Sequence, residues 1–66
     1  MSVYLLVGMQ NGENVYYNGY CMTPDKSVAF PFICYTDASM MLDHLTKEAG
    51  HVFGFLKVKH MTLLSI

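Results

Sequence analysis

Residues 3–20, VYLLVGMQNGENVYYNGY, decide the fold of this 66-residue chain. Two runs rich in valine, leucine and tyrosine flank Asn11 and Gly12. An Asn-Gly pair between β-rich runs is a strong short-range hairpin signal, because both residues adopt the left-handed backbone conformation that a tight turn requires. The sequence therefore predicts two antiparallel strands joined at Asn11 and Gly12.

The length of the hairpin loop decides which side chains share a face, because a slip of one residue moves a whole strand's side chains to the opposite face. A two-residue loop pairs Gln10 with Glu13, and it places Val3, Leu5, Val7 and Met9 on the same face as Asn14, Tyr16, Asn18 and Tyr20. A three-residue loop with Gly12 in a bulge pairs Met9 with Glu13 instead. We favour the bulged hairpin because it collects one apolar face: Val3, Leu5, Val7, Met9, Val15 and Tyr17.

The length and composition predict one domain, residues 1–66, that needs a further source of stability such as oligomerisation. A domain this small buries only about 60% of the surface that its unfolded chain exposes. Charged residues make up 14% of the chain and the formal net charge is −1, whereas a typical domain has about 25% charged residues. We therefore expect a homo-oligomer, with a dimer favoured. Four lysines and no arginine are too few for the basic surface of a nucleic-acid-binding protein.

The sequence indicates a cytoplasmic protein that does not contact a membrane. The apolar run 3–9 is too short to span a bilayer. No basic residue precedes this run and no small-residue cleavage site follows it, so we expect no signal peptide. Cys21 and Cys34 are the only cysteines. A reduced, half-buried pair of thiols is the favoured interpretation, with a disulfide as the alternative.

The rest of the chain predicts one helix and one or two further strands. Residues 21–27 read as a turn, and residues 28–33 as at best a short edge strand, because Pro31 cannot donate a hydrogen bond to a ladder. The helix is expected to begin with Thr36 as its N-cap and to end at Gly50 as a left-handed cap. Residues 51–61 predict the last strand. The buried helix face should comprise Ala38, Met41, Leu42, Leu45 and Ala49.

These elements predict an α+β fold, ββ(β)αβ, in which one helix packs on one face of a small antiparallel sheet. The helix should cover Val3, Leu5, Val7, Val15, Tyr17, Leu56 and Val58. The other face should then expose Tyr4, Leu6, Tyr16, Tyr20, Phe53 and Phe55. A contiguous uncharged aromatic patch marks an interaction site, and tyrosine with asparagine is typical of adaptable recognition surfaces. The predicted partner-binding residues are Tyr4, Asn14, Tyr16, Asn18, Tyr20, Phe53 and Phe55.

No pattern in the sequence indicates catalysis, a cofactor or a metal. The residues with suitable metal-binding chemistry lack the short paired spacing of zinc sites: Cys21, Cys34, His44, His51 and His60. Cys34 precedes the helix N-terminus, which can lower a thiol pKa. A chain this short nevertheless has little room for a substrate cleft in addition to a core. We predict no catalytic residue, no metal ligand and no enzymatic activity.

Residues 53–56, FGFL, resemble the central part of the RNP1 motif of RNA-recognition domains. In that family, outward-facing aromatic side chains of the sheet stack on bases. Here His51 and Val52 stand where the motif has a basic residue and a glycine, and Val58 stands in place of its final aromatic residue. Single-stranded nucleic acid is therefore a further alternative, although the low positive charge does not favour it.

The 66-residue plan of hairpin, helix and strand resembles the short phage-encoded proteins that inhibit host machinery or host defences, anti-CRISPR proteins among them. The resemblance lies in the overall plan and in no motif, so it assigns a role to no residue. It implies a viral, anti-defence inhibitor that acts in the host cytoplasm. Such a protein would bind a host protein stoichiometrically and block it by occupancy.

A different kind of function is the alternative: an oligomeric small-molecule binder that acts as a sponge for nucleotide signals. Its pockets would form between subunits, with tyrosine stacking on a base. The residues available for contacts to phosphate or another anion are Lys57, Lys59 and His60. A purely structural subunit of a larger assembly is a third interpretation.

Overall fold

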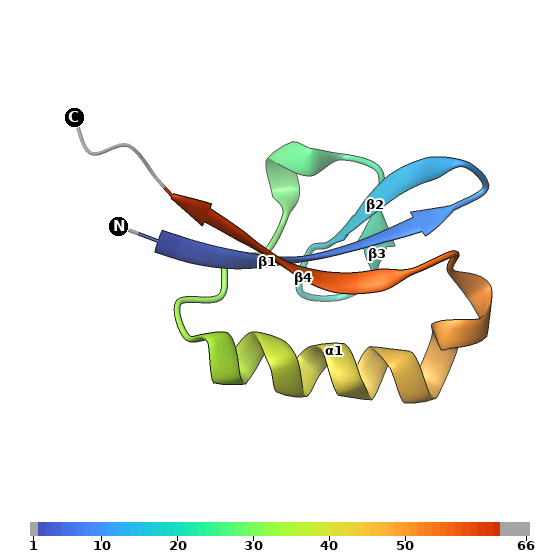
Figure 1. Ribbon diagram of the computed structural model, residues 1–66. Helices are drawn as coiled ribbons and strands as arrows, with labels where there is room; N and C mark the ends of the chain where they lie inside the picture. The colour runs from blue at the N-terminus through green and yellow to red at the C-terminus, as the bar shows by residue number, and fades with distance from the viewer. Residues whose placement is uncertain (1, 63–66) are drawn as a thin grey trace.

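A four-stranded sheet with one long helix forms the architecture that the computed structural model describes for residues 2–62. The elements in chain order are β1 (Ser2–Gln10), β2 (Glu13–Tyr17), β3 (Met22–Thr23), the 3-10 helix η1 (Lys26–Val28), α1 (Tyr35–Ala49), the 3-10 helix η2 (Gly50–Val52) and β4 (Leu56–Thr62). The strand order is β3-β2-β1-β4, with every neighbouring pair antiparallel. α1 lies along one face of the sheet (Figure 1). The predicted α+β fold is confirmed.

The hairpin between β1 and β2 has a two-residue loop, so the bulged register that we favoured is wrong. Gln10 pairs with Glu13, and the loop residues Asn11 and Gly12 have φ angles of 55° and 81°. These left-handed angles are those of a type I′ turn, whose twist matches that of the flanking strands. The geometry of the turn therefore determines the register of the hairpin, even though the other register would place more apolar side chains on one face.

The corrected register reverses the two faces of β1. Leu6, which we expected to be exposed, is fully buried and packs in the core with Tyr17, Phe32 and Ala38. Since side chains alternate along a strand, Val3, Leu5 and Val7 point away from the helix, contrary to the prediction. The remaining residues of the predicted helix-covered set do lie on the helix side: Val15, Tyr17, Leu56 and Val58.

The third strand is β3, and it lies earlier in the chain than the edge strand we expected at residues 28–33. β3 pairs with β2 over two residues. Residues 28–33 contribute only an isolated bridge, in which Phe32 and Tyr4 exchange two backbone hydrogen bonds of 2.8 Å. Pro31 explains the interruption, because it has no N–H to donate. The bridge places Phe32 against β1 and in the core.

Four of the five residues predicted for the buried face of α1 lie in or against the core, whereas Ala49 is only half-buried and both ends of the helix differ from the prediction. Ala38 is buried, and Met41, Leu42 and Leu45 pack against the core. The helix begins one residue before Thr36, with Cys34 as its N-cap. Gly50 has right-handed angles, φ −58° and ψ −27°, because the chain continues into η2 instead of reversing in a left-handed cap.

The last strand is shorter than predicted. Residues 51–55 belong to η2 and the bend that follows, and β4 begins at Leu56. The bend is tied to β1, since Met9 donates to the Phe55 carbonyl at 3.1 Å and accepts from Gly54 N–H at 2.7 Å. No helix within residues 2–62 has the length and apolar character needed to cross a membrane.

Candidate functional site on the open face of the sheet

The face of the sheet opposite α1, here called the open face, carries the candidate site. Strand pairing brings residues of β1, β2 and β4 together on it. Val7 of β1 lies directly opposite Tyr16 on one side and directly opposite Lys57 on the other. A tyrosine, a valine and a lysine thus form one row across three strands, because directly opposed residues project to the same face.

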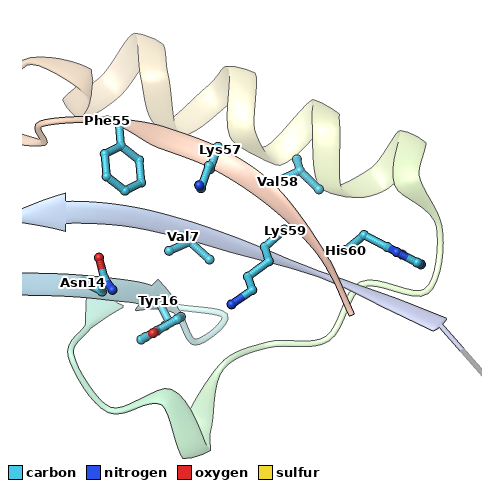
Figure 2. A pocket seen from close by; sticks show the side chains of 8 residues that line it. All are labelled: Val7, Asn14, Tyr16, Phe55, Lys57, Val58, Lys59 and His60. Atoms are coloured by element: carbon cyan, nitrogen blue, oxygen red, sulfur yellow. The ribbon is translucent and has the colours of Figure 1, made fainter. Parts of the chain in front are cut away.

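A hollow of about 360 Å³ lies on this face and is called the basin. Its lining comprises Val7, Asn14, Tyr16, Phe55, Lys57, Val58, Lys59 and His60. Figure 2 shows Val7 between the β2 residues Asn14 and Tyr16 and the β4 residues Lys57 and Lys59. The basin therefore has an apolar floor, aromatic side chains on two sides and lysines along β4.

The charged side chains that the strands direct to the open face are all positive. Lys57 and Lys59 are its charged strand residues, and both are exposed. The Lys57 Nζ atom lies 5.2 Å from the centroid of the Phe55 ring, within the range of a cation–π contact. The Asn14 amide and the Tyr16 hydroxyl add neutral hydrogen-bond donors. A partner group that carries a carboxylate or phosphate beside an apolar surface matches this lining.

The structure directs five of the predicted site residues to the basin and places five elsewhere. Those at the basin are Asn14, Tyr16, Phe55, Lys57 and Lys59; His60 borders the hollow, but it lies opposite Tyr4 and its ring packs on the helix side. Tyr4 lies on the helix side, where its ring packs 5.6 Å from the Tyr35 ring and 5.2 Å from the His60 ring. Its position follows from the corrected register of β1, which sends even-numbered residues toward the helix.

The other three predicted residues lie outside the strands. The Asn18 Oδ1 atom accepts hydrogen bonds of 2.8 and 2.9 Å from the backbone N–H groups of Tyr20 and Cys21, so this side chain holds the turn after β2. Tyr20 stands in that turn and is 93% exposed. Phe53 is half-buried at the end of η2. Of the RNP1-like segment, Phe53 and Gly54 thus precede the strand, and only Phe55 lines the basin.

Val7 is the central basin residue that our sequence interpretation missed. We assigned it to the helix side because the bulged register placed it there. The two-residue loop, which the Asn-Gly pair favours on turn chemistry alone, places Val7 beside Tyr16. The sequence signal that places Val7 on the open face was therefore present in the Asn11-Gly12 pair.

A second, more apolar hollow of about 490 Å³ lies between α1 and residues 30–32. Its lining comprises Phe30, Phe32, Asp37, Met40, Met41 and His44. It collects none of the predicted site residues.

The cysteines and histidines do not gather into a site in the described part of the chain. Cys21 and Cys34 are both free and exposed, so the expected half-burial of these thiols is wrong. Residues 2–62 contain no group of three or more histidine, cysteine or acidic side chains placed to hold a metal ion.

Cys34 differs from an ordinary exposed cysteine through its place at the start of α1. Its thiol makes no capping hydrogen bond. The backbone N–H of Asp37, and then that of Thr36, nevertheless favour the thiolate and hold the pKa of Cys34 below its usual value, although the Asp37 carboxylate opposes this in part.

We predict that iodoacetamide alkylates Cys34 faster than Cys21 at neutral pH, because a lowered pKa increases the thiolate fraction. Both thiols are exposed, so Cys21 serves as an internal reference for access. Mass spectrometry of the alkylated peptides across neutral and alkaline pH gives both rates. The rate at Cys34 should rise with a midpoint below the usual cysteine pKa. Equal rates with a midpoint at the usual value would contradict the prediction.

Comparison of the chain with models of protein families, with curated proteins and with solved structures finds no match in any of the three.

Proposed function

We propose that this protein is a stoichiometric binding protein, without enzymatic chemistry of its own, that recognises a partner protein through the open face of its sheet. The observation that supports this most directly is the basin, where Tyr16, Phe55 and two lysines surround the apolar floor at Val7. No part of the proposal requires a covalent step or a cofactor.

The chemistry of the basin suits protein recognition. Tyrosine supplies a large contact area at a low cost in conformational entropy, and aromatic side chains in desolvated pockets contribute much of the energy of interfaces. Lys57 and Lys59 would select partners with complementary negative charge and speed their association. The Asn14 amide can orient the partner through hydrogen bonds.

The resemblance to short phage-encoded inhibitors supports a host protein as the partner. On this proposal the protein acts in the host cytoplasm, occupies a surface of a defence protein and blocks it. A compact protein with one prominent binding face suffices for inhibition by occupancy. Self-association, with a dimer favoured, stays a prediction, and sedimentation velocity measures it directly.

The test compares three forms of the protein: wild type, the double variant Tyr16→Ala with Phe55→Ala, and Tyr20→Ala. The double variant removes both aromatic walls of the basin. Tyr20→Ala removes an exposed tyrosine from the turn beyond β2 and is the matched control. Each form is immobilised, bacterial proteins that it retains are identified by mass spectrometry, and each candidate partner is purified and titrated by calorimetry.

We expect a partner that binds wild type and Tyr20→Ala with a defined stoichiometry and binds the double variant at least about tenfold more weakly, as for the loss of interface anchors. Circular dichroism should show the same helix content in all three forms. If every retained protein binds the double variant as tightly as wild type, the open face is not the binding site and the proposal is abandoned.

A small anionic ligand with an aromatic ring is the second candidate, and the size of the basin favours it. Its volume of about 360 Å³ falls within the roughly 300–1,000 Å³ of small-molecule pockets. Thermal-shift measurements with cyclic nucleotides distinguish the candidates, since a ligand at about 100 times its Kd stabilises the folded state by about 2.7 kcal/mol. A large increase in Tm on addition of a cyclic nucleotide, lost in the Lys57→Ala and Lys59→Ala variants, would favour nucleotide binding over recognition of a partner protein.

A further inference from the structure

The outer edge of β4 is the feature of the sheet that the proposed function leaves unused. β4 stands at the end of the strand order β3-β2-β1-β4, and within residues 2–62 no strand pairs with its outer side. It has seven residues and no proline, whereas β3, at the opposite edge, has two residues. Figure 1 shows β4 running alongside β1 for most of its length. An edge of this length is a template for another strand.

The pairing of β1 indicates which backbone groups of β4 face outward. Tyr4 directs both its N–H and its C=O to Phe32, away from β4. Because these directions alternate along an antiparallel strand, Val3, Leu5 and Val7 direct theirs to β4. Their partners in β4 are Met61, Lys59 and Lys57. The backbone groups left for an incoming strand are therefore those of Leu56, Val58, His60 and Thr62.

The side chains beside this edge indicate the chemistry of the strand that fits it. Lys57 and Lys59 both project to the open face, two residues and thus about 6.8 Å apart along β4. An antiparallel incoming strand places one residue opposite each lysine, at positions that are not hydrogen-bonded and where opposed Cα atoms lie about 4.5 Å apart. Acidic side chains at those two positions pair with the lysines, whereas basic ones repel them.

We propose that the edge of β4 accepts an extended segment of the partner protein that carries acidic residues at alternate positions, with their side chains directed toward Lys57 and Lys59. The segment adds a fifth strand to the sheet. This inference rests on the proposed function, since the same lysines line the basin of the open face, and it specifies the partner by conformation and charge.

The same lysines disfavour two of the registers in which a second copy of this chain could pair with the edge. A two-fold pairing centred on Val58 sets Lys57 opposite Lys59 of the other copy. A pairing centred on Lys59 sets that lysine opposite itself. Like charges directly opposed across strands are destabilising, and lysine on an edge strand is a known device against self-pairing. An acidic segment turns this repulsion into attraction.

The test uses a fluorescein-labelled eight-residue peptide in which glutamate alternates with threonine and valine. Two control peptides accompany it: one with lysine in place of each glutamate, and one with the acidic sequence N-methylated at alternate amides, which removes the ladder donors. Fluorescence polarisation at low ionic strength gives the Kd of each. Amide hydrogen exchange, with and without peptide, reports on Val58 and His60.

We expect the acidic peptide to bind at least about tenfold more tightly than the lysine peptide, because two attractive pairs replace two repulsive ones. N-methylation should abolish binding. The peptide should slow exchange at the Val58 and His60 amides, while the amides of Lys57 and Lys59 are already protected in the free protein. The double variant Lys57→Glu with Lys59→Glu should reverse the preference between acidic and lysine peptides.

Three outcomes overturn the inference. The acidic peptide does not bind, it binds without slowing exchange at Val58 and His60, or these two amides become protected in the free protein as its concentration rises, which assigns the edge to a second copy. None of these outcomes depends on Tyr16 and Phe55. A partner whose binding requires those two residues would support the proposed function even if the edge fails its own test.

Discussion

Replacing Leu6 with alanine should lower the free energy of unfolding by about 2–5 kcal/mol, which is the usual cost of such a truncation in a packed core. Leu6 is the largest fully buried side chain in the described structure, and it packs against Tyr17, Phe32 and Ala38. Removal of its isopropyl group leaves a cavity between β1 and α1. Urea denaturation followed by circular dichroism measures the loss.

The size of this effect matters because small domains have little stability in reserve. Typical domains unfold with about 5–15 kcal/mol, and small ones lie toward the lower end. Met40→Ala is the control within the helix, since Met40 is 67% exposed and truncation of an exposed side chain usually changes stability by within about 0.5 kcal/mol.

The same measurement also tests the register of the hairpin between β1 and β2. A bulged hairpin would expose Leu6 and bury Leu5 under the helix, so a Leu5→Ala variant that loses far more stability than Leu6→Ala would contradict the two-residue loop.

Replacing Gly8 with alanine should cost about 1–3 kcal/mol, the typical range for overfilling a packed site. A Cβ atom at Gly8 would lie 2.7 Å from the Leu56 Cδ2 atom and 2.9 Å from the Phe55 carbonyl oxygen. The leucine side chain can rotate away, but the carbonyl belongs to the backbone where β4 begins. The substitution therefore forces β1 and β4 apart at this point. Thermal denaturation should show a loss of about 4–8 °C for each kcal/mol in a domain of this size.

Gly54→Ala is the matched control for Gly8→Ala, because both glycines lie where β1 and β4 meet. A Cβ atom at Gly54 would make only ordinary contacts, the nearest at 3.7 Å to Met9. We expect this variant to be neutral or up to about 1 kcal/mol more stable, as for an alanine that fits the native backbone. Since Phe55 lines the basin, Gly8→Ala should also weaken partner binding. Equal stability of the two variants would show that the strands do not approach as closely as described.

The elements of the fold could be predicted from local sequence because local chemistry determines them. The Asn11-Gly12 turn and the helix from residue 35 to residue 49 each carry signals within a few neighbouring residues. Helix ends were harder to predict, because Gly50 continues into a 3-10 turn instead of reversing the chain. The third strand was placed wrongly because β3 has only two residues, and its pairing with β2 depends on the turn held by Asn18.

Part of the candidate site could also be predicted, because local sequence determines which side chains of the last strand share a face. Lys57 and Lys59 alternate with Leu56 and Val58, so their common face could be read from the sequence. Tyr4 was misplaced because β1 is apolar on both of its faces. Only its pairing with a second strand distinguishes one face from the other.

The sequence by itself determined that this chain forms a hairpin, one amphipathic helix and a final strand with lysines on one face. The tertiary structure decided which side of β1 the helix covers. β1 is an inner strand, and β2, β4 and Phe32 all pair with it. Its side chains are buried on both faces, with Leu6 at 0% exposure toward the helix and Val7 at 5% under the basin. Burial alone could not choose between two such faces, and the type I′ turn together with the packing of Phe32 and Tyr17 around Leu6 made the choice.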